Sequence, residues 1–184
     1  LHSGIYGGSV DNPALVLCQM MAALRDKRGR IAVPGFYDRV QKLTRYEREQ
    51  MKRLPISAAQ YRRLLGVKAL FGEMGYTHHE QRSARPTLEI NGLTSGYQGE
   101  GSKTIVPAWA SAKLTCRLVP NQDPREINRL LKRQLKKLCP PSVKLEIEDG
   151  HGAEAYHVPP TGPQAQAALE ALREAFGHEP VILR

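Results

Sequence analysis

Two side chains in the middle of the sequence, Thr104 and Arg117, have the chemistry to bind an anion. Arg117 falls on the polar side of an alternating segment, so it faces a cleft or solvent. A guanidinium fork matches the geometry of a carboxylate. Thr104 stands at the start of the same segment, so a hydroxyl and a guanidinium can address one anionic group. The alternative is that both residues serve solubility and β propensity, as residues on exposed strand faces often do.

Histidines are the other candidates for chemistry. His78-His79-Glu80 is the only dense cluster of potential metal ligands, but neighbouring residues on one element point in different directions, which favours a solvated loop. His151 and His157 flank a Gly-rich loop without an acidic or Cys partner. The sequence contains no HExxH, no G-x-S-x-G and no P-loop. It therefore predicts no metal site in this chain.

The chain is basic, with 27 Lys and Arg against 18 Asp and Glu and a net charge of +9. Such a balance favours anionic partners. A predicted helix over 123–138 carries many of these cations, so a phosphate-binding face is one interpretation. We favour the other, the solvated side of an amphipathic helix. RNA binders of the ferredoxin-like type also carry aromatic residues on their central strands, and here that face shows Lys113, Thr115 and Arg117.

Hydrophobic periodicity predicts the elements that position these residues. Alternation predicts strands over 87–91, 110–118 and 143–148, and a short one over 181–183. Helices are expected to open where a Pro follows a capping residue or a turn, at Pro13, Pro124 and Pro163. Residues 38–85 are polar, basic and helix-prone, and predict an insertion of short helices over 46–54 and 58–70.

This order of elements predicts an α+β fold, an antiparallel sheet with helices on one face. A ferredoxin-like core needs one more strand before the first helix, and we expect that strand to precede Leu1. The chain has 184 residues, of which 41% are hydrophobic and 24% charged, so one globular domain with a real core is expected.

No apolar run approaches the ~18 residues of a membrane span. The chain begins with Leu1-His2-Ser3 rather than with Met or a leader, so we expect a piece of a longer protein. Its three cysteines form no CxxC pair and are expected to be reduced thiols of a cytoplasmic protein.

Five segments occur in a fixed order with compatible spacing: Leu1–Val10, Asp26–Gly29, Gly101–Pro107, Cys116–Asn121 and Gly150–Gly152. Together they resemble the lid domain of carnosinase-type metallopeptidases. This is the dipeptidase branch of a clan that also contains aminoacylases and succinyl-diaminopimelate desuccinylase. Residues 38–85 resemble this branch least.

The resemblance implies a single lid, or dimerisation, domain over 1–184 with a helical insertion at 38–85. In the family, this domain is inserted into a catalytic domain that binds two zinc ions, or manganese or cobalt. None of those metal-ligand motifs is present here, so this chain is expected to hold no cofactor and to be inactive alone. The expected partners are a second lid in a homodimer, the catalytic domain of the parent, and a peptide or N-acyl amino acid substrate. Neither nucleic acid nor a membrane is expected.

The resemblance also assigns roles to residues. It implies that His2 reaches the active site of the neighbouring subunit and stabilises the oxyanion of the tetrahedral intermediate. Thr104, Arg117 and His151 would contact the substrate and its terminal carboxylate.

Three alternatives stay open. Arg117 can instead form an ion pair with Glu89 or Glu146. The chain can be an interaction domain whose edge strand pairs with a second copy, without any active-site role. It can also be a free-standing basic α+β module that binds nucleic acid.

Overall fold

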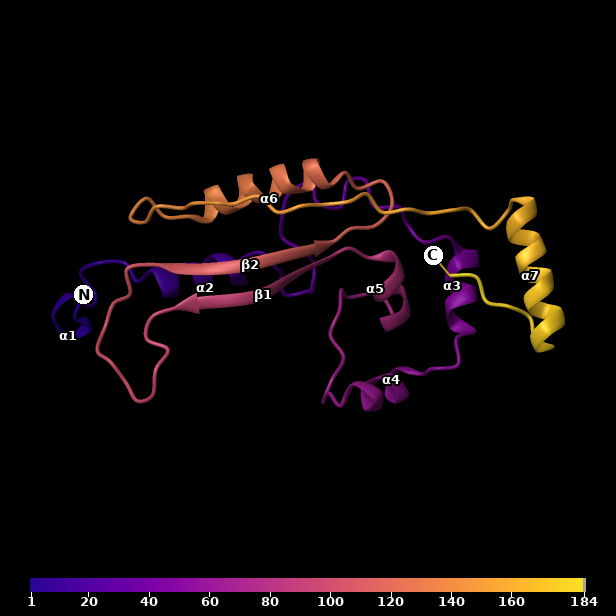
Figure 1. Cartoon of the computed structure of the whole chain (residues 1–184), viewed down its shortest axis with the longest axis horizontal. Coiled ribbons are helices and arrows are strands. Elements are labelled where there is room, and N and C mark those ends of the chain that lie inside the picture. The colour runs from indigo at the N-terminus through magenta and orange to yellow at the C-terminus, as the bar shows by residue number, and fades with distance from the viewer. Residues whose placement is uncertain (184) are drawn as a thin grey trace.

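The computed structural model describes residues 1–183. The molecule is elongated, with the chain start and the first short helix at one end and the last helix at the other (Figure 1). In chain order the elements are α1 (Ser3–Tyr6), α2 (Pro13–Ala22), α3 (Arg45–Lys52), α4 (Ala58–Leu65), α5 (His78–Ala84), β1 (Thr87–Ser95), β2 (Ala110–Arg117), α6 (Pro124–Leu138) and α7 (Pro163–Phe176).

The two strands form an antiparallel pair whose register runs from Thr87 opposite Arg117 to Ser95 opposite Ala110. The pairing shifts between Ile90 and Gly92, where the extra residue forms a bulge. This bulge changes the phase of the side-chain alternation, which is why the sequence pattern ended the strand near Asn91. β1 in fact continues to Ser95, into residues that the pattern assigned to a loop.

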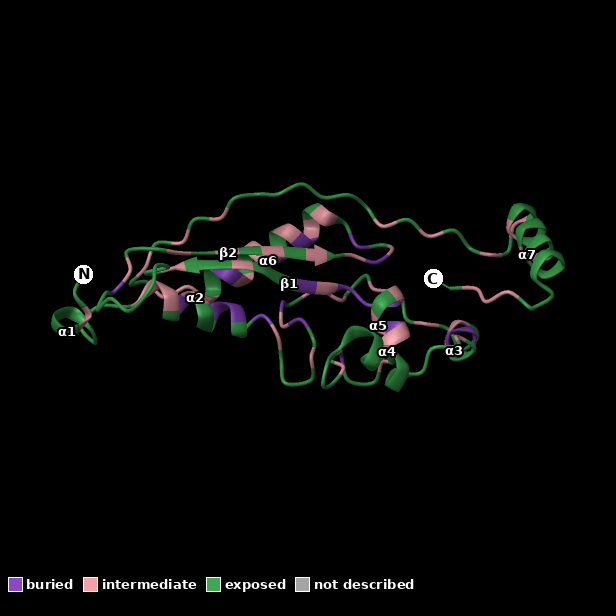
Figure 2. Cartoon of the chain, turned by 60° about the horizontal axis from the view of Figure 1, so that its bottom comes forward, coloured by how far each residue is buried: buried purple, intermediate pink, exposed green. Residues whose placement is uncertain are grey.

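Both long helices of the first and middle parts, α2 and α6, bury their apolar stripes in one core with the strands. Val16 and Met20 come from α2, and Leu130 and Leu135 from α6. Alternate residues of β2 pack against the same cluster, while Lys113, Thr115 and Arg117 stay exposed. Figure 2 shows the buried residues gathered where these elements meet. The predicted α+β fold, with helices on one face of an antiparallel sheet, is confirmed.

Residues 143–148 are not a strand, which corrects the prediction from their alternation. Val143, Leu145 and Ile147 do pack against the core, as the pattern requires. Within residues 1–183, however, the sheet contains only β1 and β2, so this segment has no ladder to join. A hydrophobic alternation fixes which side chains face inward, but a strand also needs a hydrogen-bonding neighbour. The same reason applies to 181–183, which are also not a strand.

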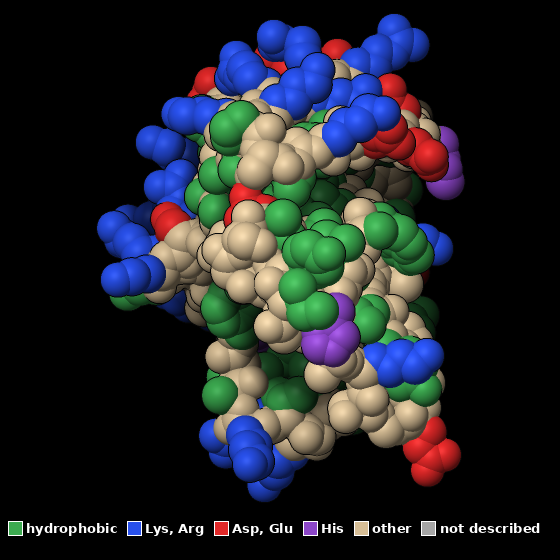
Figure 3. Space-filling view, turned by 90° about the vertical axis from the view of Figure 1, so that its left-hand side faces the viewer, with side chains coloured by type: hydrophobic (Ala, Val, Ile, Leu, Met, Phe, Trp, Pro, Cys, Tyr) green, Lys and Arg blue, Asp and Glu red, His purple; other side chains and the backbone are tan. Residues whose placement is uncertain are grey.

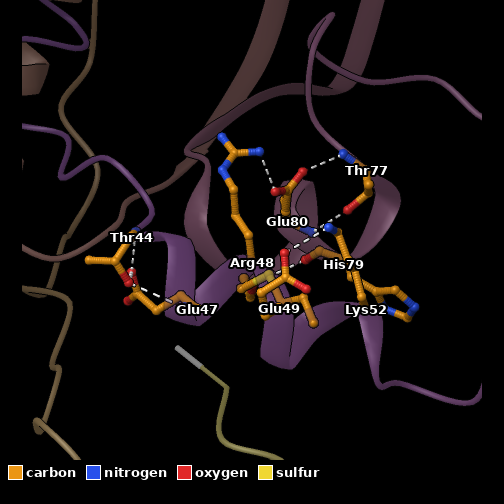
Figure 4. Close-up of polar contacts among 10 residues, drawn as sticks. Thr44, Glu47, Arg48, Glu49, Lys52, Thr77, His79 and Glu80 are labelled. Atoms are coloured by element: carbon orange, nitrogen blue, oxygen red, sulfur yellow. Dashed lines mark hydrogen bonds and ion pairs between the residues drawn. The ribbon is translucent and has the colours of Figure 1, made fainter.

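The insertion contains three short helices rather than the two predicted. α4 ends sooner than expected because Gly66 adopts a left-handed conformation, with φ at 67°, and closes the helix. His78-His79-Glu80, which we expected in a loop, is the first turn of α5. The missed signal was the capping box of Thr77 and Glu80, in which each side chain bonds the backbone of the other (Figure 4).

The last helix, α7, stands apart from the core at the far end of the molecule (Figure 1). It starts at Pro163 and ends at Gly177, as predicted, and has no buried residue. Its apolar residues Leu172 and Phe176 are exposed. Among the described residues, no helix has both the length and the hydrophobicity needed to cross a membrane.

Candidate functional site

The first residues of the chain lie beside the segment that leads into β2. The N–H of Ser3 donates to the carbonyl of Thr104 at 3.0 Å, and the N–H of Val106 donates to that of Leu1 at 2.7 Å. This backbone pairing brings His2 and Thr104 together across 102 positions of sequence. The distance from Thr104 Oγ1 to His2 Nε2 is 3.2 Å.

The ring of His2 is held from its other side by α1. The N–H of Gly4 donates to His2 Nδ1 at 3.0 Å, so His2 is the capping residue of that helix. Because a backbone N–H can only donate, Nδ1 must keep its lone pair, and the proton of the neutral ring lies on Nε2. His2 is exposed, and Leu1, Ile5 and Tyr6 around it are exposed apolar residues.

Figure 3 shows this end of the molecule, where a histidine side chain at the centre of the view lies at the surface among hydrophobic ones. Lys and Arg gather on the side of α6. A neutral N–H donor at an apolar, open surface is suited to a negatively charged oxygen that another molecule brings.

Arg117 lies at the opposite end of β2. From Ala110 to Arg117 the strand makes seven steps of ~3.3 Å, a length of about 23 Å. Arg117 is exposed and forms no ion pair with any residue between 1 and 183. Its two proposed partners are engaged elsewhere, Glu89 with Arg25 and Glu146 with Lys144. The guanidinium is therefore available to a ligand.

His151 lies in the loop that passes the start of α6. A Cβ on the adjacent Gly152 would lie 3.0 Å from the Cβ of Pro124, so this loop runs directly against that helix. Asp149 anchors the loop by accepting from Asn128 at 2.8 Å and pairing with Lys132, and the hydrogen bond from Lys132 lowers the pKa of Asp149. Because β2 leads into α6, His151 is placed toward the Arg117 end and away from His2.

The structure thus divides the four predicted residues into two sets. It brings His2 and Thr104 into direct contact, and it places Arg117 and His151 toward the other end of the sheet. The sequence pattern gave no sign of this division, because the contact of His2 with Thr104 is created by backbone pairing at long range.

The cluster His78-His79-Glu80 is occupied by structural contacts. Figure 4 shows Glu80 held by Arg48 at 2.5 Å and by the N–H of Thr77 at 2.7 Å. His79 Nε2 lies 2.9 Å from the carbonyl of Ile56. In the part of the chain that the structure describes, no group of three His, Cys, Asp or Glu residues could hold a metal ion. The side chains of this cluster therefore serve contacts within the insertion.

His78 packs beside a hollow of about 1300 Å³ between α3, α4 and α5. Its ring stacks on Tyr61 with centroids 4.8 Å apart. Burial, followed by the nearby charge of His79, lowers the pKa of His78, so the neutral form is favoured. Its role is therefore packing between α4 and α5.

The basic side chains of α6 lie on the solvated face of an amphipathic helix, as the sequence predicts. The opposite face of this helix is buried through Ile127, Leu130 and Leu135. Part of the basic face is neutralised, since Arg129 lies 3.9 Å from Glu126 and Lys132 pairs with Asp149.

Comparison with known proteins gives the context of these residues. The chain is 29% identical over 188 residues to the Cys-Gly metallodipeptidase DUG1 of Saccharomyces cerevisiae and 28% identical over 186 residues to the Beta-Ala-His dipeptidase of Homo sapiens. These alignments include 100% of this chain but only 39% and 37% of those proteins. The chain thus spans less than half the length of the curated relatives it matches.

Solved structures give the same result. The chain superposes on an M20 family metallo-carboxypeptidase from Sulfolobus solfataricus with a TM-score of 0.84 and 35% identity, over 100% of this chain and 41% of that one. With the dipeptidase Dug1p from Saccharomyces cerevisiae the TM-score is 0.79 at 29% identity, over 100% of this chain and 39% of that one. The family profile described as "Peptidase dimerisation domain" matches residues 1–143. The chain therefore belongs to the peptidase dimerisation domain family of the M20 metallopeptidases.

Proposed function

We propose that this chain dimerises a metal-dependent dipeptidase and contributes side chains to two active sites of the dimer. The observation that carries the proposal is the division of the candidate residues. His2 and Thr104 are in contact beyond the Ala110 end of β2, and Arg117 lies at its other end, about 23 Å further along the strand. The names of the relatives, a Cys-Gly metallodipeptidase and a Beta-Ala-His dipeptidase, support the reaction class.

The separation between these two sets of residues determines how they are distributed over the two active sites of the dimer. A dipeptide spans at most about 7 Å, so it cannot contact His2 and Arg117 of the same copy. A two-fold dimer resolves this conflict, because each site can take one set from each subunit. In this arrangement Arg117 and His151 serve the active site of their own subunit, and His2 and Thr104 serve that of the partner.

Each set has a distinct chemical task. The Nε2–H of His2 and the hydroxyl of Thr104 are neutral donors for the oxygen that becomes negative during attack on the amide. Arg117 is a permanent cation suited to the terminal carboxylate of a peptide or N-acyl amino acid. His2 therefore acts on the transition state, and Arg117 acts mainly on substrate binding.

The proposed dimer surface combines the outer side of α2 with the free edge of β1. Within the described chain, β1 pairs only with β2, so its other edge can accept a strand. Leu15 on α2 and Leu93 on β1 are 59% and 53% exposed. A second copy covers both, since the same patch meets itself across a two-fold axis.

The metal is assigned to the parent protein. The described residues of this chain contain no group of three His, Cys, Asp or Glu side chains that could bind an ion. Metal ions, as two zinc or as manganese or cobalt, and the cytoplasmic location remain part of the proposal. The free thiols Cys18, Cys116 and Cys139 are consistent with a reducing compartment.

We also propose the domain arrangement. Residues 38–85 form a helical insertion in the dimerisation domain, and α7 packs its exposed stripe against the catalytic domain of the parent. The family match ends at residue 143, which supports assigning α7 to the junction with that domain.

The experiment uses the full-length parent enzyme with His2→Ala and Arg117→Ala. We expect His2→Ala to lower kcat by roughly 100-fold to 1000-fold with little change in KM. Arg117→Ala should raise KM for a dipeptide, and it should matter little for the same dipeptide with an amidated C-terminus. Mixing the two variants, assayed at a substrate concentration far below the raised KM so that both are impaired, tests the sharing directly, because each heterodimer contains one site with both sets intact.

Random exchange of subunits should restore about a quarter of the wild-type activity, since half of the dimers are mixed and each has one intact site. Each variant, taken alone through the same exchange procedure, is the control. A mixture no more active than its components would show that both residues serve the same site, or none.

A further inference from the structure

We propose that Gly4 is a positioning residue, which fixes the tautomer and the orientation of His2 through its backbone. The effect of Gly4 on the ring of His2 is inferred from the geometry of the first turn. Its catalytic consequence rests on the proposed function of His2.

The tautomer follows from the hydrogen bond between Gly4 and His2. The N–H of Gly4 reaches His2 Nδ1 at 3.0 Å, and this donor cannot reverse its role. The neutral ring must therefore carry its proton on Nε2, the atom that lies 3.2 Å from Thr104 Oγ1. Without the N–H of Gly4, the proton could occupy either nitrogen, and only one of those forms offers a donor at Nε2.

The absence of a side chain at Gly4 is equally important. An ideal Cβ at this position would lie 3.0 Å from His2 Cε1 and 3.2 Å from Nδ1. Both distances are shorter than ordinary contacts, so any other residue pushes against the imidazole. His2 is exposed, and its ring can move away without disturbing the core. The expected effect of a Cβ is thus a displaced ring in an intact fold.

Thr104 holds the ring from the opposite side. With the proton on Nε2, its Oγ1 accepts from His2, and its own hydroxyl hydrogen is free to donate. A ligand oxygen that replaces Oγ1 as the acceptor of the Nε2–H can also accept the hydroxyl hydrogen of Thr104. This pair of donors exists only while Gly4 keeps the proton on Nε2.

The test of the structural part is the protonation of His2 in the 184-residue chain. Nitrogen-labelled histidine and long-range proton–nitrogen correlation spectra distinguish a protonated from an unprotonated ring nitrogen, and His2→Gln assigns the signal. We expect the wild type to show Nε2–H alone at a pH where the ring is neutral. Gly4→Ala should give a mixture of tautomers.

Two further variants make the result specific. Thr104→Val should keep the Nε2–H form, because the hydrogen bond from Gly4 remains. Ile5→Ala, in the same turn and with its side chain 70% exposed, should resemble the wild type. A wild-type ring protonated on Nδ1, a Gly4→Ala spectrum like that of the wild type, or an equal change in either further variant would overturn the proposal.

Kinetics of the parent enzyme test the consequence. We expect Gly4→Ala to lower kcat roughly 10-fold to 100-fold with KM almost unchanged, since a small displacement of a donor costs this much. Unchanged kcat in Gly4→Ala, with mixed tautomers and a strong effect of His2→Ala, would overturn the positioning role. If His2→Ala itself retains full kcat, the proposed function of His2 fails instead, and the spectra still decide whether Gly4 fixes the tautomer.

Discussion

Arg85 joins the helical insertion to the sheet through a buried ion pair. It is the last residue before Pro86 and β1, and it binds Glu73 through two hydrogen bonds of 2.9 and 2.8 Å. Both side chains are at most 8% exposed. The guanidinium also lies over the rings of Tyr37 and Tyr76, with its carbon 4.8 and 4.4 Å from their centroids. A single residue thus links the loop after α4 to the end of the sheet that carries Arg117.

This geometry predicts a large effect of Glu73→Gln on stability. The substitution leaves the charge of Arg85 buried without its anion, and loss of one partner of a buried pair typically costs about 3–5 kcal/mol. Urea unfolding followed by circular dichroism measures the change in the free energy of unfolding.

The matched control is Glu49→Gln in the same insertion. Glu49 forms a 2.8 Å pair with Lys52 at the surface, where solvent screens the charges, so we expect almost no change. Equal unfolding midpoints for the two variants would mean that the buried pair does not hold the insertion in place.

At the scale of elements, the starts of helices can be predicted from the sequence, because the residues that cap a helix are close neighbours in the chain. Asn12 with Pro13, and Asp123 with Pro124, were predicted as caps, and the side chain of each capping residue accepts a backbone N–H as expected. The capping box of Thr77 and Glu80 is equally local, so the start of α5 is also predictable from the sequence.

Features that depend on residues far apart in the sequence could not be predicted from it. The bulge after Ile90 exists only in relation to β2, and the pairing of Thr104 with His2 joins residues 102 positions apart. Alternation correctly placed Arg117 on an open face, but it could not say that Arg117 and His2 lie at opposite ends of the sheet. The division of the site into two sets therefore required the structure.

Residues 143–148 are expected to become a strand in the full-length protein. Their apolar side chains pack on the core, yet they have no ladder partner within the described chain. We propose that a further strand of the full-length protein lies between this segment and the free edge of β2, as a ferredoxin-like arrangement requires. We expect it to pair with both in the full-length protein.

Hydrogen exchange measures this pairing. Amides of 143–148 should exchange quickly in the 184-residue chain and slowly in the full-length protein. The buried helix α6 provides the internal control, because its amides are bonded within the helix and should be protected in both. Fast exchange of 143–148 in the full-length protein would show that no strand joins at this position.

At the scale of the whole molecule, a cysteine reports on the proposed dimer surface. Cys18 is exposed on α2, three positions after Leu15 and on the same side of the helix. Cys116 instead points from β2 into the core, and burial raises its pKa to about 11. Only a thiolate reacts rapidly with alkylating reagents, so Cys116 should remain unmodified near neutral pH.

Dimerisation through α2 and β1 must therefore protect Cys18 and leave Cys116 unchanged. We expect the alkylation rate of Cys18, followed by peptide mass spectrometry, to fall as the protein concentration rises through the range in which dimers form. Leu15→Lys should abolish both the dimer and the protection, because a buried ammonium without a partner is costly at an interface.

Val158→Lys is the matched control, since Val158 is 58% exposed against 59% for Leu15 but lies outside the proposed surface. This variant should dimerise and protect Cys18 like the wild type. If dimers form while Cys18 reacts at the same rate as in the monomer, the subunits meet on another face. His2 and Arg117 of different subunits would then need a different geometry to share an active site.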